Sequence, residues 1–348
     1  MNKKLLTLAV AAAMVSPLAV QAAGTGPTVY GVMQVAVENV DSDNAAREDA
    51  WQVNSRQSRW GIKGSEDLGN GLSAVYKIEF QVDLDGNSGL TNGTDRAAGE
   101  SDRNQYVGLS HKDYGTLLLG RHDSPIKMLT IGRDQFNTKL GDWNEVQGQS
   151  GVDTMEGPGA NRYNDAILYK SPKFNGFEAV AMITPGNDDT KANDADGISD
   201  GLTSIGGRYV NGPIYAALAW EERDFGNNDE EESWRALINY DIAGFRLGAM
   251  YHDQEDVNFN ATGDDAETWQ LSASYKFGNN VVKAMYQEGD QDVSGGSDLE
   301  YEAFAVGAEH HFSKRTHVYA IYMETDEETS GGGGDDVDAF SLGLQHKF

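Results

Sequence analysis

Few residues of this chain are arranged for covalent or metal chemistry. Its 348 residues include 7 histidines and no cysteine, which excludes disulfides and cysteine-based zinc or iron–sulfur sites. His310 and His311 are adjacent and would point to opposite faces of a strand, while His346 shares the face of Phe348. No HExxH or P-loop pattern occurs. We therefore expect no metal site, no cofactor and no enzymatic activity.

Two acidic segments, VDLDGNSG at residues 82–89 and NDADGISDG at residues 193–201, have the composition of calcium-binding loops. In an EF-hand frame counted back from Gly86 or Gly197, the first position falls on Gln81 or Ala192. Neither frame has the glutamate required at its twelfth position. Neither segment is an EF-hand, and weak binding of divalent ions by the clustered carboxylates is the alternative.

The overall charge excludes other classes. Asp and Glu number 55 against 27 Lys and Arg, a net charge of −28, so nucleic acid is not an expected partner. The mean hydropathy of −0.54 is too polar for a bundle of transmembrane helices. Yet 15 Tyr, 12 Phe and 6 Trp are more aromatic residues than an acidic disordered chain carries, so they must lie in a core or face lipid.

The first residues have the layout of a secretory signal peptide. Lys3 and Lys4 precede an apolar run, LLTLAVAAAMV, and small residues follow up to Ala22. We expect residues 1–22 to be removed after export and residues 23–348 to form a single domain.

Beyond Val29 the chain shows runs of about ten residues in which apolar and polar side chains alternate, as in strands with two different faces. The clearest runs are LSAVYKIEF at 72–80, SWRALINY at 233–240, ETWQLSASYKF at 267–277 and the last nine residues. In SWRALINY, for example, Arg235 lies on the polar face, opposite to Trp234.

Two kinds of connection alternate along the chain. Short turns lie at 65–71, 111–115, 171–176, 211–213, 241–244, 277–280 and 313–316. Long acidic loops begin near residues 40, 84, 122, 186, 223, 253, 289 and 325. Seven turns and eight loops connect sixteen antiparallel strands, with all long loops at one end. We assign the acidic runs at 186–190, 227–233 and 324–338 to these loops, as a negatively charged canopy.

Alternation alone does not say which face points inward, and a soluble β-sandwich is the alternative. Export without cysteines and strands of about ten residues favour a closed barrel that spans the outer membrane of a Gram-negative cell. The sequence therefore predicts an all-β, 16-stranded antiparallel transmembrane barrel. Its polar side chains would line a channel, its apolar side chains would face lipid, and Lys63 and Lys77 would point into the lumen.

Three segments resemble the Gram-negative general-diffusion porins. SRWGIKGSEDLGNGLSAVYKIEF at 58–80 is similar to their second strand, turn and third strand, NQYVGLSHKDYGTLLLGRHDSP at 104–125 to their fourth and fifth strands, and the final GLQHKF to their last strand. The resemblance implies a homotrimer in which a long third loop, here His122 to Ala160, folds into the lumen and narrows it.

The resemblance also implies which residues form this constriction. Arg59, Arg103 and Arg162 match the basic wall of the family, whereas Val32 stands where some members carry a first-strand lysine, so selectivity between cations and anions stays open. Acidic residues of the third loop would face this wall. The candidates are Asp134, Asp142 and Glu145, with Asp153 and Glu156 further along the loop.

Two further residues have expected roles outside the constriction. Arg121 faces outward by alternation, where a porin trimer has its contact, and we expect it to pair with Glu100 or Asp95 of a neighbouring subunit, or else to extend to the membrane interface. The family places a terminal aromatic residue, here Phe348, as the signal read by the outer-membrane insertion machinery.

The expected function is a passive, water-filled outer-membrane pore for small hydrophilic solutes and ions, surrounded by membrane lipid and lipopolysaccharide. The alternatives are an adhesive or structural barrel acting through its acidic loops, and a barrel enzyme.

Overall fold

The computed structural model describes residues 26–42, 50–85, 100–143, 162–185, 201–224, 230–255, 265–292 and 296–348. Residues 1–22 of the expected signal peptide lie outside these ranges, as do residues 86–89 and 193–200 of the two calcium-like segments. The loop residues Asp95, Glu145, Asp153 and Glu156 and the side chain of Glu100 also lie outside them. No helix among the described residues is long and apolar enough to cross a membrane.

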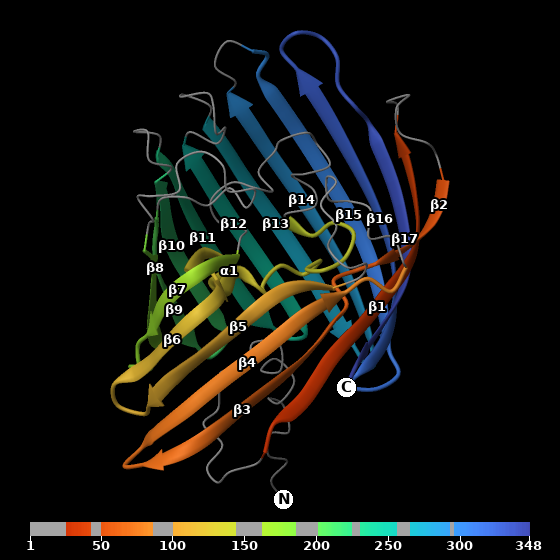
Figure 1. The fold of residues 1–348 in the computed structure, drawn as a ribbon. Helices are drawn as coiled ribbons and strands as arrows, with labels where there is room; N and C mark the ends of the chain where they lie inside the picture. The colour runs from red at the N-terminus through yellow and green to blue at the C-terminus, as the bar shows by residue number, and fades with distance from the viewer. Residues whose placement is uncertain are drawn as a thin grey trace, which may run out of the picture.

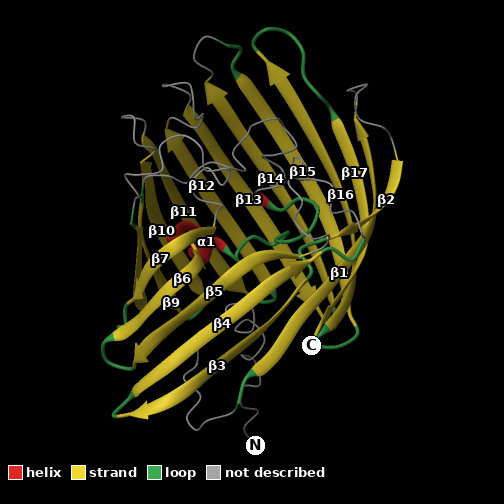
Figure 2. Ribbon diagram, viewed as in Figure 1, coloured by secondary structure: helices red, strands yellow, loops and turns green. Residues whose placement is uncertain are grey.

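The described chain forms seventeen strands and one short helix (Figures 1 and 2). The first half consists of β1 (Thr28–Ser42), β2 (Ala50–Ser55), β3 (Arg59–Gly69), β4 (Leu72–Val82), β5 (Glu100–His111), β6 (Gly115–Asp123), α1 (Pro125–Thr130), β7 (Arg162–Lys170) and β8 (Phe177–Thr184). The second half consists of β9 (Leu202–Asn211), β10 (Ile214–Asp224), β11 (Glu230–Ile242), β12 (Phe245–Glu255), β13 (Asp265–Phe277), β14 (Asn280–Asp292), β15 (Leu299–His311), β16 (Thr316–Thr329) and β17 (Val337–Lys347).

These strands close into a barrel of sixteen strand positions, which confirms the predicted fold. Apart from β2 and β3, which both pair with β1, every strand pairs antiparallel with its neighbour in sequence, and β17 pairs with β1 to complete the ring. β2 and β3 share one position in the ring, because β3 pairs with the first part of β1, residues 28–32, and β2 pairs with its later part, residues 35–40. The break between them contains Gln57, whose φ of +52° interrupts the extended backbone.

The short turns lie at one end of the barrel, where the described chain also enters β1 and ends at Phe348 (Figure 1). The register pairs Val32 with Lys347, and the backbone N–H of Gly31 donates to the carbonyl of Phe348 at 3.1 Å. Closing the barrel satisfies the backbone groups that an open sheet would leave unpaired in lipid.

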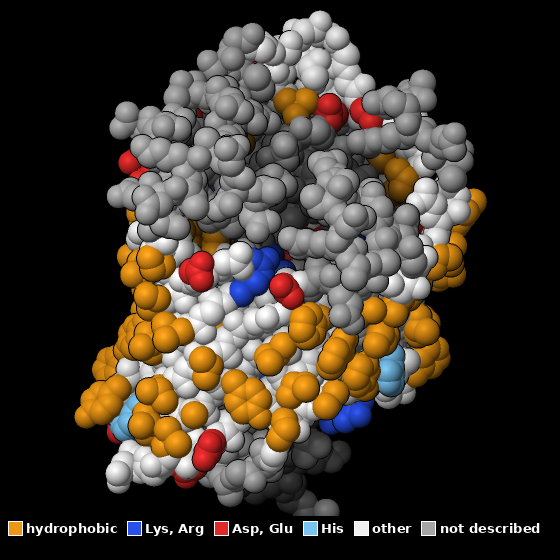
Figure 3. Space-filling model, viewed as in Figure 1, with side chains coloured by type: hydrophobic (Ala, Val, Ile, Leu, Met, Phe, Trp, Pro, Cys, Tyr) orange, Lys and Arg blue, Asp and Glu red, His pale blue; other side chains and the backbone are white. Residues whose placement is uncertain are grey.

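The two faces of the strands are those that alternation predicts. On β17, Phe340, Leu342 and Leu344 point outward with 39%, 54% and 49% of their surface exposed, whereas Ser341 and Gln345 point inward and are buried. Hydrophobic side chains accordingly cover the flank of the barrel (Figure 3). The apolar surface lies outside and the polar surface inside, as a membrane barrel requires.

The acidic runs are placed differently from our expectation. Residues 230–233 belong to β11, 324–329 to β16 and 337–338 to β17, because hydrogen-bonded pairing continues well beyond the apolar band. The carboxylates at these strand ends face outward. We call this set the carboxylate belt: Glu222, Asp224, Glu230, Glu232, Asp253, Glu255, Asp265, Glu267, Glu288, Asp290, Asp292, Glu300, Glu302, Glu324, Asp326, Glu328 and Asp338. The run at 186–190 lies outside the described residues.

Candidate functional site

The connection after β6 turns into the lumen of the barrel, where α1 lies against the inner wall (Figure 1). Pro125 occupies the first turn of α1, a position that tolerates its missing N–H, and Ile126 and Leu129 are buried against β10 and β11. The hydroxyl of Tyr215 donates to the carbonyl of Leu129 at 2.6 Å and holds the end of the helix on β10.

The loop then crosses to the opposite part of the wall. Phe136 and Leu140 are 0% and 1% exposed and pack with side chains of β14–β17, including Met285 and Tyr319. The side-chain amide of Gln34 donates to the carbonyl of Thr138 at 2.6 Å. Residues 124–143 therefore lie inside the barrel and are attached to two opposite parts of its wall.

A buried carboxylate on β15 adds an electrostatic attachment for the loop. Glu309 Oε1 lies 2.7 Å from Lys283 Nζ and 3.5 Å from Lys139 Nζ, and its Oε2 lies 3.1 Å from His311 Nε2. Lys283 also donates to the carbonyl of Gln135 at 2.9 Å. Glu309 thus pairs with Lys139 on one side of Phe136 and with Lys283, which in turn donates to Gln135 on the other side.

A polar cavity of about 80 Å³ remains between the loop and the wall. Five of its lining residues are cationic: Arg59, Arg103, Lys127, Arg162 and Arg235. Two are acidic, Asp134 and Asp142.

The predicted basic wall is held by carboxylates on neighbouring strands. Arg103 Nε donates to Glu79 Oε1 at 2.9 Å, and Arg162 Nε lies 2.7 Å from Asp123 Oδ1. Arg59 instead donates to the carbonyl of Gln57 at 2.9 Å. The structure brings the three predicted arginines together at one cavity, although they come from β3, β5 and β7.

Lys63 and Lys77 point into the lumen but do not line this cavity. They face each other across β3 and β4, and their ammonium groups lie 4.7 Å and 5.8 Å from the centre of the Tyr30 ring. Lys77 Nζ also lies 3.1 Å from Glu79 Oε2. Both residues extend the positive surface from the cavity toward the turns.

The predicted acidic residues reach the cavity, yet much of their bonding capacity is used within the loop. Asp134 accepts the backbone N–H groups of Phe136 at 2.9 Å and Trp143 at 2.8 Å. Asp142 accepts the N–H of Thr138 and the side-chain amide of Asn137. Burial, and the nearby Asp142 carboxylate, raise the pKa of Asp134 to about 7.

Two cationic residues of the cavity were not among our candidates. Lys127 lies one turn into α1, 4.0 Å from Asp123, and burial lowers its pKa to about 8. Arg235 comes from β11, and alternation in SWRALINY already places it on the polar face. The sequence does not show its depth in the lumen, which depends on strand register around the ring.

The remaining candidates lie elsewhere. Arg121 projects from the outer face of β6, and its Nη1 donates to Asn164 Oδ1 of the same chain at 2.7 Å. Phe348 ends the chain beside Gly31, where a side chain would collide with its ring. Among the described residues, no group of three or more His, Asp or Glu side chains is placed to hold a metal ion.

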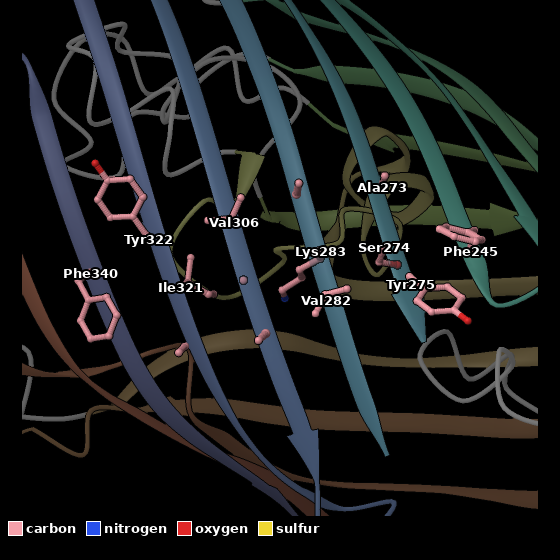
Figure 4. A pocket seen from close by; sticks show the side chains of 14 residues that line it. Phe245, Ala273, Ser274, Tyr275, Val282, Lys283, Val306, Ile321, Tyr322 and Phe340 are labelled. Atoms are coloured by element: carbon pink, nitrogen blue, oxygen red, sulfur yellow. The ribbon is translucent and has the colours of Figure 1, made fainter. Parts of the chain in front are cut away.

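A second hollow, of about 630 Å³, lies on the outer face instead. Alanines of β13–β16 form its floor, and aromatic residues lie at either end, Phe245 and Tyr275 on one side and Tyr322 and Phe340 on the other (Figure 4). It belongs to the lipid-facing surface and does not contribute to the lumen.

The barrel, with its apolar outside, polar lumen and an inner loop that narrows the passage, defines a transmembrane channel for small solutes. Over residues 7–330 the chain matches the Gram-negative porins, and it belongs to that family. It is 26% identical to an outer membrane porin protein of Bordetella pertussis, with 90% of this chain and 92% of that protein covered.

Solved structures agree on the fold. An anion-selective porin from Comamonas acidovorans superposes with a TM-score of 0.72 at 21% identity, covering 93% of this chain and 99% of that one. A trimer form of the outer membrane protein OmpT of Vibrio cholerae superposes with a TM-score of 0.68 at 15% identity, covering 93% and 99%. The protein is thus an outer-membrane porin that forms a channel for small solutes.

Proposed function

We propose that this channel passes small hydrophilic anions more readily than cations, because its constriction is the cavity between residues 122–143 and the arginine wall. The observation that carries the proposal is the lining of this cavity, in which five cationic side chains accompany two carboxylates. The anion-selective porin from Comamonas acidovorans shares the fold.

The local charge of the constriction outweighs the charge of the whole molecule for a permeating ion. The carboxylate belt lies on the outer face of the barrel. The barrel wall separates it from the lumen, and dissolved ions screen its charge. At physiological ionic strength a charge is screened over about 8 Å. The arginines act at contact distance, in a narrow passage where water screens less.

The reversal potential of the purified protein in a planar bilayer tests this proposal. In a KCl gradient we expect chloride to be more permeant than potassium. Arg59→Gln should lower the chloride-to-potassium permeability ratio several-fold. Arg59 has no ion pair among the described residues, so the substitution removes a positive charge without depriving a carboxylate of its partner.

Lys314→Gln, in the exposed turn after β15, is the matched control and should leave the ratio unchanged. A wild-type reversal potential of the cation-selective sign would refute the proposal and show that the acidic outer surface determines selectivity.

We infer that three of these chains assemble in the outer membrane after removal of residues 1–22, as the trimer form of the Vibrio cholerae protein suggests. Arg121 would then lie at the contact between subunits, and charge reversal at Arg121 should reduce the detergent-resistant trimer. Phe348 would serve as the insertion signal, and its deletion should reduce insertion.

The carboxylate belt would lie at the level of lipopolysaccharide, where divalent ions would bridge the two negative surfaces.

We propose a passive channel without catalytic activity. One GxSxG spacing occurs at residues 197–201, but a nucleophile elbow of this type leads from a strand into a helix. Here strand β9 begins at Leu202, directly after the last glycine. The family relationship favours a channel over an adhesive role.

A further inference from the structure

The outer face of the barrel has a hollow that plays no part in the channel. Its volume is about 630 Å³, and its lining comes mainly from β13–β16 (Figure 4). Ala308 of β15 lies on its floor between two direct partners in register, Val282 of β14 and Ala320 of β16. The rings of Tyr275 and Tyr322 border the hollow on opposite sides. A flexible acyl chain fits such a hollow, because it can lie along the floor and contact the rings at its sides.

Basic side chains stand at the turn end of this hollow. His310 is the next outward residue of β15 beyond the floor, and the turn that follows carries Lys314 and Arg315. His346 is exposed on the same outer face of β17. The backbone N–H of Lys347 donates to the carbonyl of Arg315 at 2.8 Å, which holds the turn beside β17. We call this group the basic corner: His310, Lys314, Arg315 and His346.

Both histidines of the basic corner are held by one ring nitrogen. His310 Nδ1 lies 2.8 Å from Asn280 Oδ1, and His346 Nδ1 lies 2.8 Å from Thr316 Oγ1. The exposed ring of Phe312 packs edge-on against His310, with 4.9 Å between the ring centres. Each imidazole is therefore oriented by the protein, and its Nε2 has no partner among the described residues.

The two cations of the turn have no carboxylate to pair with. Ser313 Oγ accepts the backbone N–H groups of Arg315 and Thr316 at 3.1 Å and fixes the shape of the turn. Lys314 and Arg315 are exposed, and neither takes part in an ion pair among the described residues. On the described outer face of β14–β17, no Asp or Glu lies between the basic corner and the carboxylate belt. The corner is thus free to bind an anionic group from the membrane.

We propose that the basic corner and the hollow together bind one anionic glycerophospholipid, of which phosphatidylglycerol is the test case. Its phosphate would lie at Lys314 and Arg315, which donate charge-assisted hydrogen bonds to phosphate oxygens. One acyl chain would extend from there along the hollow toward the middle of the membrane. The site lies in the leaflet at the turn end, opposite to the carboxylate belt, which we assigned to the level of lipopolysaccharide.

A lipid is a better occupant of this surface than a second copy of the chain. We place the contact between subunits at Arg121 on β6, which lies on the other side of the ring from β15. The hollow would then face the surrounding membrane in the trimer as well. The charge of the basic corner adds a preference for anionic over zwitterionic lipid.

Native mass spectrometry of the purified full-length protein in detergent tests the site. We expect each chain to retain one phosphatidylglycerol, and to bind phosphatidylcholine at least about tenfold more weakly. Lys314→Gln/Arg315→Gln should weaken the binding of phosphatidylglycerol about tenfold or more and leave that of phosphatidylcholine unchanged. Both residues lie in an exposed turn, so the double variant keeps the strand pairing of the barrel.

Two pairs of variants separate the hollow from general charge. Lys112→Gln/Lys173→Gln removes two exposed cations from the turns after β5 and β7, far from the hollow, and should leave lipid binding unchanged. Ala308→Leu fills the floor with every charge in place and should also weaken the binding of phosphatidylglycerol. Ala179→Leu adds the same bulk to the outer face of β8 and serves as its control.

Three outcomes would overturn the proposal. The first is equal binding of the two lipids by the wild-type protein, and the second is an equal loss of binding in both lysine-containing double variants, which would indicate the general charge of the turn end. The third is unchanged binding in Ala308→Leu, which would remove the hollow from the site. None of these outcomes bears on the reversal potential, so the proposed anion preference is tested separately.

Discussion

At the scale of single residues, the charge of the constriction depends on two groups that titrate near neutral pH. Burial and Asp142 raise the pKa of Asp134 to about 7, and burial lowers the pKa of Lys127 to about 8. Below pH 6 the first is neutral and the second charged, whereas above pH 9 the first is charged and the second neutral. The cavity therefore loses positive charge as the pH rises.

We expect the chloride-to-potassium permeability ratio to fall between pH 6 and pH 9, measured from reversal potentials at each pH. Asp134→Asn should remove the part of the change near pH 7 and keep the part near pH 8. A ratio that does not vary over this range would show that neither group faces the permeating ion.

The acidic candidates illustrate what the sequence reveals at this scale. Asp134 and Asp142, which the family resemblance predicts for the constriction, both line the cavity, but the resemblance does not reveal that each accepts local backbone N–H groups. The hydrogen bond from the N–H of Phe136 to the side chain of Asp134, two residues earlier, forms an Asx-turn. Such a turn is common for aspartate and could be predicted from the local sequence. The bond from Trp143 joins residues nine apart and depends on the folded loop.

At the scale of elements, the inner loop is positioned by the wall to which it attaches. Its anchors are the apolar side chains of Phe136 and Leu140 and the ion pairs of Glu309 with Lys139 and Lys283. Glu309 is a positioning residue in this arrangement, because it acts on the passage only through the loop.

Glu309→Gln should loosen this attachment, since two buried lysines would lose their shared carboxylate, at a cost of about 3 kcal/mol. We expect open-channel current with more frequent fluctuations and a lower melting temperature. Glu302→Gln, on the outward face of the same strand, should add no current noise. Equal noise in the two variants would mean that the carboxylate does not hold the loop.

The strands could be predicted from sequence far better than the loop. Period-2 alternation identifies both faces of β13 and β17 because a strand side chain has only two directions. The path of the loop depends on contacts such as Gln34 with Thr138 and Gln135 with Ser272, which join residues more than one hundred positions apart. Alternation carries no information about such contacts.

At the scale of the whole molecule, the net charge of −28 is concentrated where strands run past the apolar band. Within the carboxylate belt, like charges stand directly opposite across neighbouring strands. Glu288 faces Glu302, Glu302 faces Asp326, and Asp290 faces Glu300. No lysine or arginine occupies an outward position among them in the described part of β10–β17. Each such pair destabilises a sheet by about 0.2–1 kcal/mol.

The belt should therefore make the barrel depend on salt. The Debye length falls from about 30 Å at 0.01 M to about 3 Å at 1 M, so the melting temperature should rise with sodium chloride and more steeply with magnesium. The double variant Glu288→Gln/Glu302→Gln should melt at a higher temperature in low salt and show a weaker salt dependence. The control double variant Glu66→Gln/Asp67→Asn should retain the salt dependence of the wild-type melting temperature, since these residues lie near the turns at the other end of the barrel. Identical salt profiles for the two double variants would contradict this account, and the repulsion would then have to lie in loops outside the belt.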